Sequence, residues 1–139
     1  DKHVTGPIQV IVIGFDHFEA TGKILAEIRK VRKRGVVRII DVKCPASGEA
    51  AKNDWSNLDL LTPTDEVKFV VQDRQDYAFA KDVIARHALE GRCAAILISP
   101  VHGVLPGKEL AAWILADRLP VRLQLQAHKY IWSADARGV

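Results

Sequence analysis

The sequence predicts an α/β protein with one open, mostly parallel sheet of five strands, flavodoxin-like or resembling half of a barrel. Three observations support this fold class. Short apolar runs rich in Val and Ile alternate with segments whose apolar residues recur at helical spacing. Gly, Pro or polar residues separate most of these segments. With 139 residues and 48% hydrophobic content, the chain can bury the core of a single domain over residues 1–139.

The predicted order is β-α-β, a long loop, and then β-α-β-α-β, with right-handed crossovers between parallel strands. Residues 6–42 form the first βαβ unit. Its strands are residues 7–13, a nearly all-apolar run, and residues 36–42. Residues 23–34 are predicted to be a helix, because apolar side chains line one of its faces. Those side chains are Ile24, Leu25, Ile28 and Val31.

Residues 43–65 connect the two units and show no sustained apolar period. They are rich in Pro, Ser and Asn. A connection of about 20 residues is long for a compact domain, and such loops are mostly functional or packed against another part of the molecule.

Residues 66–139 form the βαβαβ unit. Strands are predicted at residues 66–71 and 93–98, and helices at residues 75–89 and 107–117. The side chains predicted to face the sheet are Tyr77, Ala80, Val83 and Ile84 on the first helix and Leu110, Trp113 and Ile114 on the second.

The closing strand lies in residues 119–132, LPVRLQLQAHKYIW. Its first part alternates apolar and polar residues with a period of two. The alternation predicts that Val121, Leu123 and Leu125 form a buried face.

Polar residues follow the last two predicted strands, where ligands gather in parallel sheets. Gln126, His128 and Lys129 follow the closing strand, and Ser99 and His102 lie in the loop SPVHG. Together they predict a pocket for a small anionic or heteroaromatic ligand. The alternative is that they are loop residues hydrogen-bonded to the backbone.

Asp41 and Lys43 lie at the end of the second strand in the same way. They suit a ribose, a carboxylate or an amine, and a solvated loop explains them equally well. No metal site is predicted. Asp16, His17 and Glu19 are attributed to the N-terminus of the first helix, where acidic residues are favoured by the helix dipole.

Composition narrows the partners and the compartment. The net charge is only +3, and the basic run at residues 29–34 is attributed to the end of a helix, so no nucleic-acid partner is expected. No run approaches the roughly 20 apolar residues of a membrane span. Two cysteines, Cys44 and Cys93, without a disulfide framework fit a reducing compartment, and we expect a cytoplasmic protein.

Residues from about 38 to 139 resemble the C-terminal half of 7-carboxy-7-deazaguanine synthase, a radical S-adenosylmethionine enzyme of queuosine biosynthesis. The matching segments are IIDVKCPASGE at 39–49, NLDLLTPTDEVKFVV at 57–71, DRQDYAFAKDVI at 73–84, ISPVHG at 98–103 and ELAAWILADRLPVRLQLQAHKYIW at 109–132. They cover about three-quarters of the chain.

The resemblance implies a partial (β/α) barrel whose strand ends hold S-adenosylmethionine and a carboxytetrahydropterin, assisted by magnesium. By position, Asp41 and Lys43 match the cofactor side. Ser99, Gln126 and His128 match the substrate side.

The chain departs from that family in its first part. The family's CxxxCxxC-type motif for a [4Fe–4S] cluster is absent, and two cysteines 49 positions apart cannot supply three ligands. Residues 6–42 instead resemble the start of a small uncharacterised bacterial protein family. Because the two resemblances meet at a shared strand and the chain contains no methionine, we expect a chimaera, engineered or natural.

Three functions follow, in this order of preference. The first is a recombined or truncated α/β scaffold with no catalytic activity of its own and no bound cofactor. The second is residual binding of S-adenosylmethionine or a carboxytetrahydropterin. The third is one half of a radical S-adenosylmethionine lyase completed in trans, or a homodimer, because an unpaired sheet edge recruits a partner.

Overall fold

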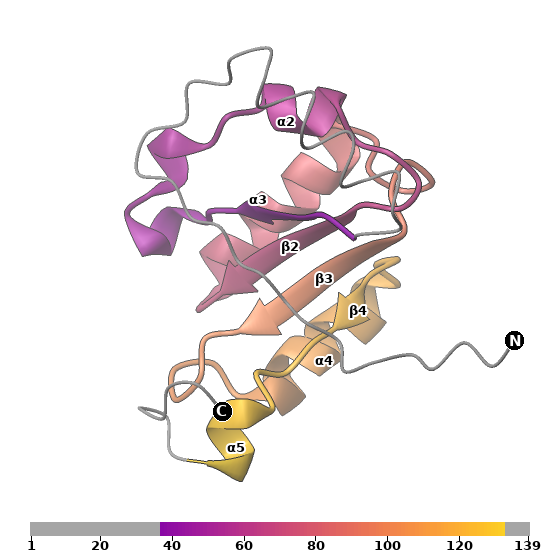
Figure 1. Ribbon diagram of the computed structural model, residues 1–139. Coiled ribbons are helices and arrows are strands. Elements are labelled where there is room, and N and C mark those ends of the chain that lie inside the picture. Colours follow the sequence, from indigo (N-terminus) through magenta and orange to yellow (C-terminus); the bar gives the residue numbers. More distant parts are fainter. Residues whose placement is uncertain (1–36, 133–139) are drawn as a thin grey trace, which may run out of the picture. The chain divides into compact units, whose positions relative to one another are not determined.

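A computed structural model describes residues 37–132, whose strands form one four-stranded sheet (Figure 1). The strands are β1 (Ile39–Val42), β2 (Glu66–Val71), β3 (Ala95–Pro100) and β4 (Arg122–Leu123), and each neighbouring pair is parallel. The predicted α/β class and parallel sheet are confirmed. The described sheet has four strands and not the five that we expected for the whole chain. The fifth predicted strand, residues 7–13, lies outside the described residues, as does the helix predicted at residues 23–34.

The strands follow one another across the sheet in the order of the sequence. Helix α3 (Arg74–Arg86) connects β2 to β3, and α4 (Gly107–Asp117) connects β3 to β4. Right-handed crossovers between successive strands place both helices on one face, and Figure 1 shows both behind the sheet. The rings of Tyr77 in α3 and Trp113 in α4 lie 5.5 Å apart. This consecutive order is that of a segment of a (β/α) barrel, which carries its sites at the carboxyl ends of the strands.

Helix α3 begins at an N-cap formed by Asp73, whose side chain accepts a hydrogen bond of 2.8 Å from the backbone N–H of Asp76. It ends before the predicted residue 89, because Ala88 takes the left-handed conformation with φ of 47°. Helix α4 has the predicted bounds. All the side chains predicted to face inward are confirmed as buried: Tyr77, Ala80, Val83, Ile84, Leu110, Trp113 and Ile114.

The main core lies between the sheet and the two helices. Strand β2 alternates, so that Val67, Phe69 and Val71 are fully buried on the helix side while Glu66 and Lys68 are half-buried on the other side. Strand β3 is buried along its whole length, as expected for a central parallel strand.

Two strand predictions are corrected by the pairing. Strand β3 runs to Pro100, because its register with β2 continues through Val70↔Ser99 and Val71↔Pro100, so Ser99 belongs to the strand and not to the loop. Strand β4 is only two residues long. Leu123 and Leu125 are 38% and 45% exposed, so the predicted buried face is wrong there. At this end of the sheet order, β4 has only β3 beside it among the described strands.

The long loop contains three short helices: η1 (Pro45–Ser47), η2 (Ala50–Lys52) and α2 (Ser56–Asp59). It packs on α3 through Trp55, whose ring stacks on His87 at 5.3 Å and lies 6.4 Å from Phe79. Of the two expectations for this loop, packing against the rest of the molecule is therefore observed.

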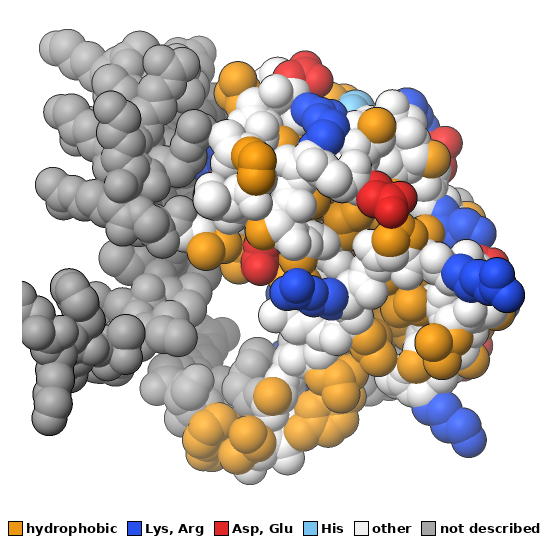
Figure 2. All heavy atoms as spheres, turned by 90° about the vertical axis from the view of Figure 1, so that its right-hand side faces the viewer, with side chains coloured by type: hydrophobic (Ala, Val, Ile, Leu, Met, Phe, Trp, Pro, Cys, Tyr) orange, Lys and Arg blue, Asp and Glu red, His pale blue; other side chains and the backbone are white. Residues whose placement is uncertain are grey.

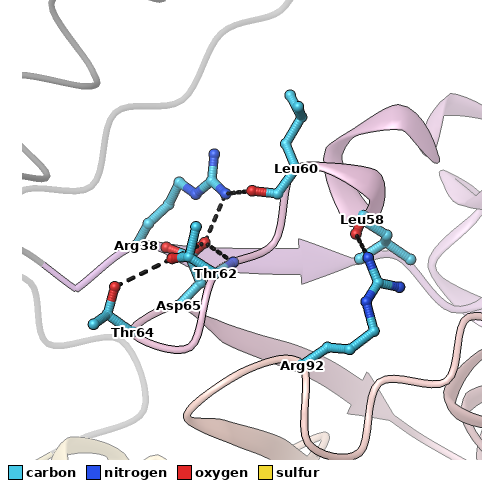
Figure 3. A network of polar contacts seen from close by, with 7 residues as sticks. All are labelled: Arg38, Leu58, Leu60, Thr62, Thr64, Asp65 and Arg92. Atoms are coloured by element: carbon cyan, nitrogen blue, oxygen red, sulfur yellow. Dashed lines mark hydrogen bonds and ion pairs between the residues drawn. The ribbon is translucent and has the colours of Figure 1, made fainter.

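A polar network ties the loop to the amino ends of the strands (Figure 3). The buried carboxylate of Asp65 accepts hydrogen bonds from Arg38 at 2.7 Å and from the backbone and hydroxyl of Thr62 at 2.8 and 2.9 Å. Arg38 also donates to the carbonyl of Leu60, and Arg92 donates to the carbonyl of Leu58. The network fixes the loop where it enters β2.

No helix among residues 37–132 is long and apolar enough to cross a membrane. The face in Figure 2 shows Lys and Arg side chains standing apart, with Asp and Glu among them, and no single basic patch.

Candidate functional site

The candidate site lies on the sheet face opposite α3 and α4, toward the carboxyl ends of the strands. Register partners on neighbouring strands point to the same face. One row across this face consists of Asp41, Lys68, Leu97 and Arg122. The face therefore brings charged groups from three strands to one level of the sheet.

Ser99 lies one step nearer the carboxyl end, opposite Val70. It is completely buried, and its hydroxyl oxygen has no hydrogen-bond partner among residues 37–132. A buried hydroxyl without a partner costs free energy, and such groups call for a bound water, ion or ligand. Ser99, a residue that the sequence had suggested for the site, is thus a buried polar group on this face without a described partner.

Asp41 and Lys43 form an ion pair at the end of β1, with 2.5 Å between Lys43 Nζ and Asp41 Oδ2. Both side chains are exposed, so the pair itself adds little stability. Asn53 from the long loop holds the Lys43 backbone: its Oδ1 accepts from the Lys43 N–H and its Nδ2 donates to the Lys43 carbonyl, both at 2.9 Å. The loop therefore fixes the position from which Lys43 reaches out.

Asp76 is a second anchor of this region. Its buried carboxylate accepts hydrogen bonds from the backbone N–H of Ala46 at 2.9 Å and of Gln72 at 3.2 Å. It thereby ties the start of the long loop to the end of β2. Sequence reasoning missed this residue, although the spacing of Asp73 and Asp76 at a helix start resembles a capping box.

His102 lies in the loop after β3 and is half-buried. Its ring meets Tyr130 of α5 (His128–Ile131) edge-on, with 5.0 Å between ring centroids. The two rings line an open, mainly apolar groove with Gly103, Val104, Leu105 and Pro106. The structure thus brings the loop SPVHG beside the segment after β4.

Gln126 and Lys129 are half-buried and belong to this same segment. The carbonyl of Gln126 accepts a hydrogen bond of 2.9 Å from the N–H of Lys129 and so starts the turn of α5. His128 is the first residue of α5, and its side chain is not among those described.

The predicted residues therefore divide into three sets. Asp41 and Lys43 end β1, while Ser99 lies in β3 next to the segment that carries Gln126. His102 instead belongs to the groove against α5. Lys68 was missed by sequence reasoning, because its place on this face follows only from the pairing of β2 with its two neighbours.

The thiols of this chain do not fit an iron–sulfur cluster. Burial raises the pKa of Cys44 to about 12, with Asp76 and Asp41 adding to the effect, and burial also raises the pKa of Cys93. Cluster ligands are thiolates, which these surroundings disfavour. Among residues 37–132 no group of three His, Cys, Asp or Glu side chains is placed to hold a metal ion.

The described part is thus a parallel α/β sheet with helices on one face and polar groups gathered toward the strand ends of the other. This is the class of fold that binds small molecules at the carboxyl ends of its strands.

Within this fold class, the chain is similar in sequence to several curated proteins that share one name. The chain is 45% identical over 116 residues to the 7-carboxy-7-deazaguanine synthase of Koribacter versatilis, covering 75% of this chain and 51% of the relative. It is 49% identical over 104 residues to that of Chlorobaculum tepidum and 41% over 107 residues to that of Leptospira interrogans. These matches cover 73% and 72% of this chain and 47% and 43% of the two relatives.

The resemblance to 7-carboxy-7-deazaguanine synthases is therefore confirmed, and the chain spans about half the length of the curated relatives it matches. No family model matches the chain. No solved structure matches it either.

Proposed function

We propose that the described part is the ligand-binding sheet of a 7-carboxy-7-deazaguanine synthase-like protein, and that it holds a small ligand at its strand ends. The observation that carries this proposal is the buried, unpartnered hydroxyl of Ser99, on the face where β1, β2 and β4 also bring charged groups. The relatives that share this part of the sequence are named for a carboxylated, nitrogen-containing ring.

In this proposal, Lys43 and Ser99 each contribute one polar group that contacts the ligand. Lys43, held by Asn53, offers an ammonium group at the end of β1. Ser99 offers a hydroxyl that both donates and accepts hydrogen bonds. Such groups orient a polar ring, while the buried strand beneath them excludes water.

The chain does not carry out the radical reaction by itself in this proposal. The cluster and S-adenosylmethionine of the resembled family would supply a radical, and that chemistry needs three closely placed thiolates. This sequence contains two cysteines, and both thiols have a raised pKa. Binding is therefore proposed without turnover by this chain alone.

The test is a calorimetric titration of the purified chain with S-adenosylmethionine and, separately, with a carboxytetrahydropterin. We expect heat that saturates near one ligand per chain for at least one of them. Lys43→Ala should weaken that binding, whereas Lys52→Ala should not, because Lys52 is exposed and its ammonium group already pairs with Glu49. A cooperatively folded sample that gives no heat with either ligand would refute the proposal.

A second candidate is completion of an enzyme in trans. It is favoured by β1, where Ile39 is 49% exposed, and by Val37 just before it, which is 53% exposed. Apolar residues on a strand edge attract a further strand or a second copy. Mixing the chain with the cluster-bearing half of a relative should restore product formation, and failure of the two to associate in sedimentation would exclude this candidate.

A further inference from the structure

The segment that follows β4, residues 125–132, is joined to its surroundings mainly through side chains. The last backbone hydrogen bond between this end of the chain and β3 runs from the N–H of Gln124 to the carbonyl of Ile98, at 2.9 Å. Within residues 37–132, the backbone hydrogen bonds of the segment beyond that point connect its own residues to one another. The segment is therefore a short turn whose place on the described part of the protein depends on side-chain contacts.

Two such contacts join the segment to the loop after β3 and to the start of α4. The ring of Tyr130 meets the ring of His102 edge-on, with 5.0 Å between the centroids. Leu125 lies over Gly107, where an added Cβ would stand only 3.2 Å from Leu125 Cδ2. Aromatic pairs prefer particular geometries and stabilise beyond their buried area, so the pair of His102 and Tyr130 also fixes how the segment is oriented.

The turn carries two of the residues that the sequence suggested for ligand binding. Gln126 and Lys129 are half-buried, whereas the other side chains described in the segment are exposed. The two residues are three positions apart, the spacing that brings side chains to the same side of a helical turn. A displacement of the segment would therefore move both of them together.

We propose that His102 and Tyr130 form an aromatic latch, which holds residues 125–132 in place and thereby positions Gln126 and Lys129 toward the bound ligand. This inference rests on the proposed function and deepens it, because it makes His102 a positioning residue. His102 was predicted from the sequence as a ligand contact, but its ring packs on Tyr130 and lines a mainly apolar groove.

The strength of an aromatic pair sets the size of the expected effect. Such a pair changes the ratio of docked to displaced segment by about twofold to tenfold. Ligand affinity falls in proportion to the fraction of molecules in the binding-competent arrangement. Loss of the latch should therefore weaken binding by no more than about tenfold.

The first test needs no ligand. In the full chain, His102→Ala and Tyr130→Ala should each speed backbone amide exchange of Lys129 by about twofold to tenfold, as followed by NMR. The Lys129 N–H bonds to the carbonyl of Gln126 within the turn. His102→Phe keeps an aromatic ring and should leave the exchange slow. Ile131→Ala, a change of an exposed side chain in the same turn, is the control. Thermal melting should stay close to that of the native chain, because neither ring belongs to the hydrophobic core.

The second test is calorimetric titration of the same variants with S-adenosylmethionine and, separately, with a carboxytetrahydropterin. His102→Ala should weaken the binding seen with the native chain, and His102→Phe should retain it. A phenyl ring can replace the imidazole against Tyr130, but it cannot form the hydrogen bonds of a ligand contact. The Phe variant therefore separates positioning from direct contact. Ile131→Ala should bind as the native chain does.

The outcomes decide each part of the proposal. Faster exchange and weaker binding in His102→Ala, both restored in His102→Phe, support it. Unchanged exchange in both Ala variants overturns the latch. An affinity loss in His102→Phe as large as that in His102→Ala overturns the positioning role, and so does faster exchange with unchanged affinity. If the native chain binds neither ligand, the proposed function is refuted and the positioning role with it, while the exchange rates still decide whether the latch holds the segment.

Discussion

The two ends of the sheet treat their polar groups differently. At the amino ends, Asp65 accepts three hydrogen bonds and Arg38 makes two, so the unpartnered atoms there, Asp65 Oδ1 and Arg38 Nε, belong to groups that are otherwise bonded. Toward the carboxyl ends, the Ser99 hydroxyl has no hydrogen-bond partner among the described residues, and Lys68, in the middle of β2, forms no ion pair with them. The polar groups at the amino ends are therefore held by contacts within the chain, whereas the Ser99 hydroxyl near the carboxyl ends is not, as the proposed ligand site requires. Barrel proteins divide stability and function between their ends in the same way.

The largest effect is expected from breaking the contacts at the amino ends. Asp65→Ala removes the acceptor of Arg38 and Thr62 and leaves a partly buried guanidinium without its anion. We expect the free energy of unfolding to fall by about 3–5 kcal/mol. Urea unfolding measures this change. The exposed pair of Lys52 and Glu49 is the control, since Lys52→Ala should cost less than about 1 kcal/mol. Equal costs for the two variants would contradict the division between the ends.

Low pH should weaken the same contacts of Asp65 at the amino ends of the strands. Burial opposes ionisation of Asp65, but hydrogen bonds from Arg38 and Thr62 outweigh it and lower its pKa below the ordinary value of 3.8. A depressed pKa means that the stabilisation is present above the unfolded-state pKa and is lost as the pH falls through the folded-state pKa. In the native chain, the urea concentration at the midpoint of unfolding should therefore decrease as the pH falls below about 4. Asp65→Asn should be less stable at neutral pH and show a shallower drop, and an unchanged slope in that variant would assign the acid sensitivity to other groups.

Ser99→Ala tests the carboxyl ends of the strands. Since the hydroxyl is buried and unpartnered, its removal should raise the free energy of unfolding by about 1 kcal/mol rather than lower it. Ligand binding should weaken at the same time. Chemical unfolding together with titration measures both quantities in one variant. Destabilisation by this substitution would show that the hydroxyl has a partner that holds the fold together.

The smallest effect on stability is expected at Lys43. Its pair with Asp41 is exposed, so Lys43→Ala should change the free energy of unfolding by less than about 1 kcal/mol. Asn53→Ala should cost more, about 1–2 kcal/mol, because it removes two hydrogen bonds to the Lys43 backbone. Thermal melting of the two variants side by side tests this order, and the reverse order would mean that Asn53 does not position the site.

The sequence predicted the α/β class, the bounds of β2 and α4 and the inward faces of both long helices, because each follows from local periodicity in apolar side chains. It failed at the closing strand, where Leu123 and Leu125 alternate as a buried face does and are nevertheless exposed. Alternation reports that a face is apolar but not whether another element covers it.

The residues of the candidate site show the same limit. Asp41, Lys43 and Ser99 were predicted as candidate site residues from their places near strand ends, where ligands gather in parallel sheets, and their role in binding stays a prediction. The surroundings of Lys68 and Ser99 within the described sheet depend on which strands lie side by side and in what register, and register is set by long-range pairing. The sequence by itself therefore determined the elements and their buried faces, because these rest on near neighbours in the chain. Only the tertiary structure decided which charged groups of the described residues are paired with one another, because pairing depends on contacts between residues as far apart as Arg38 and Asp65.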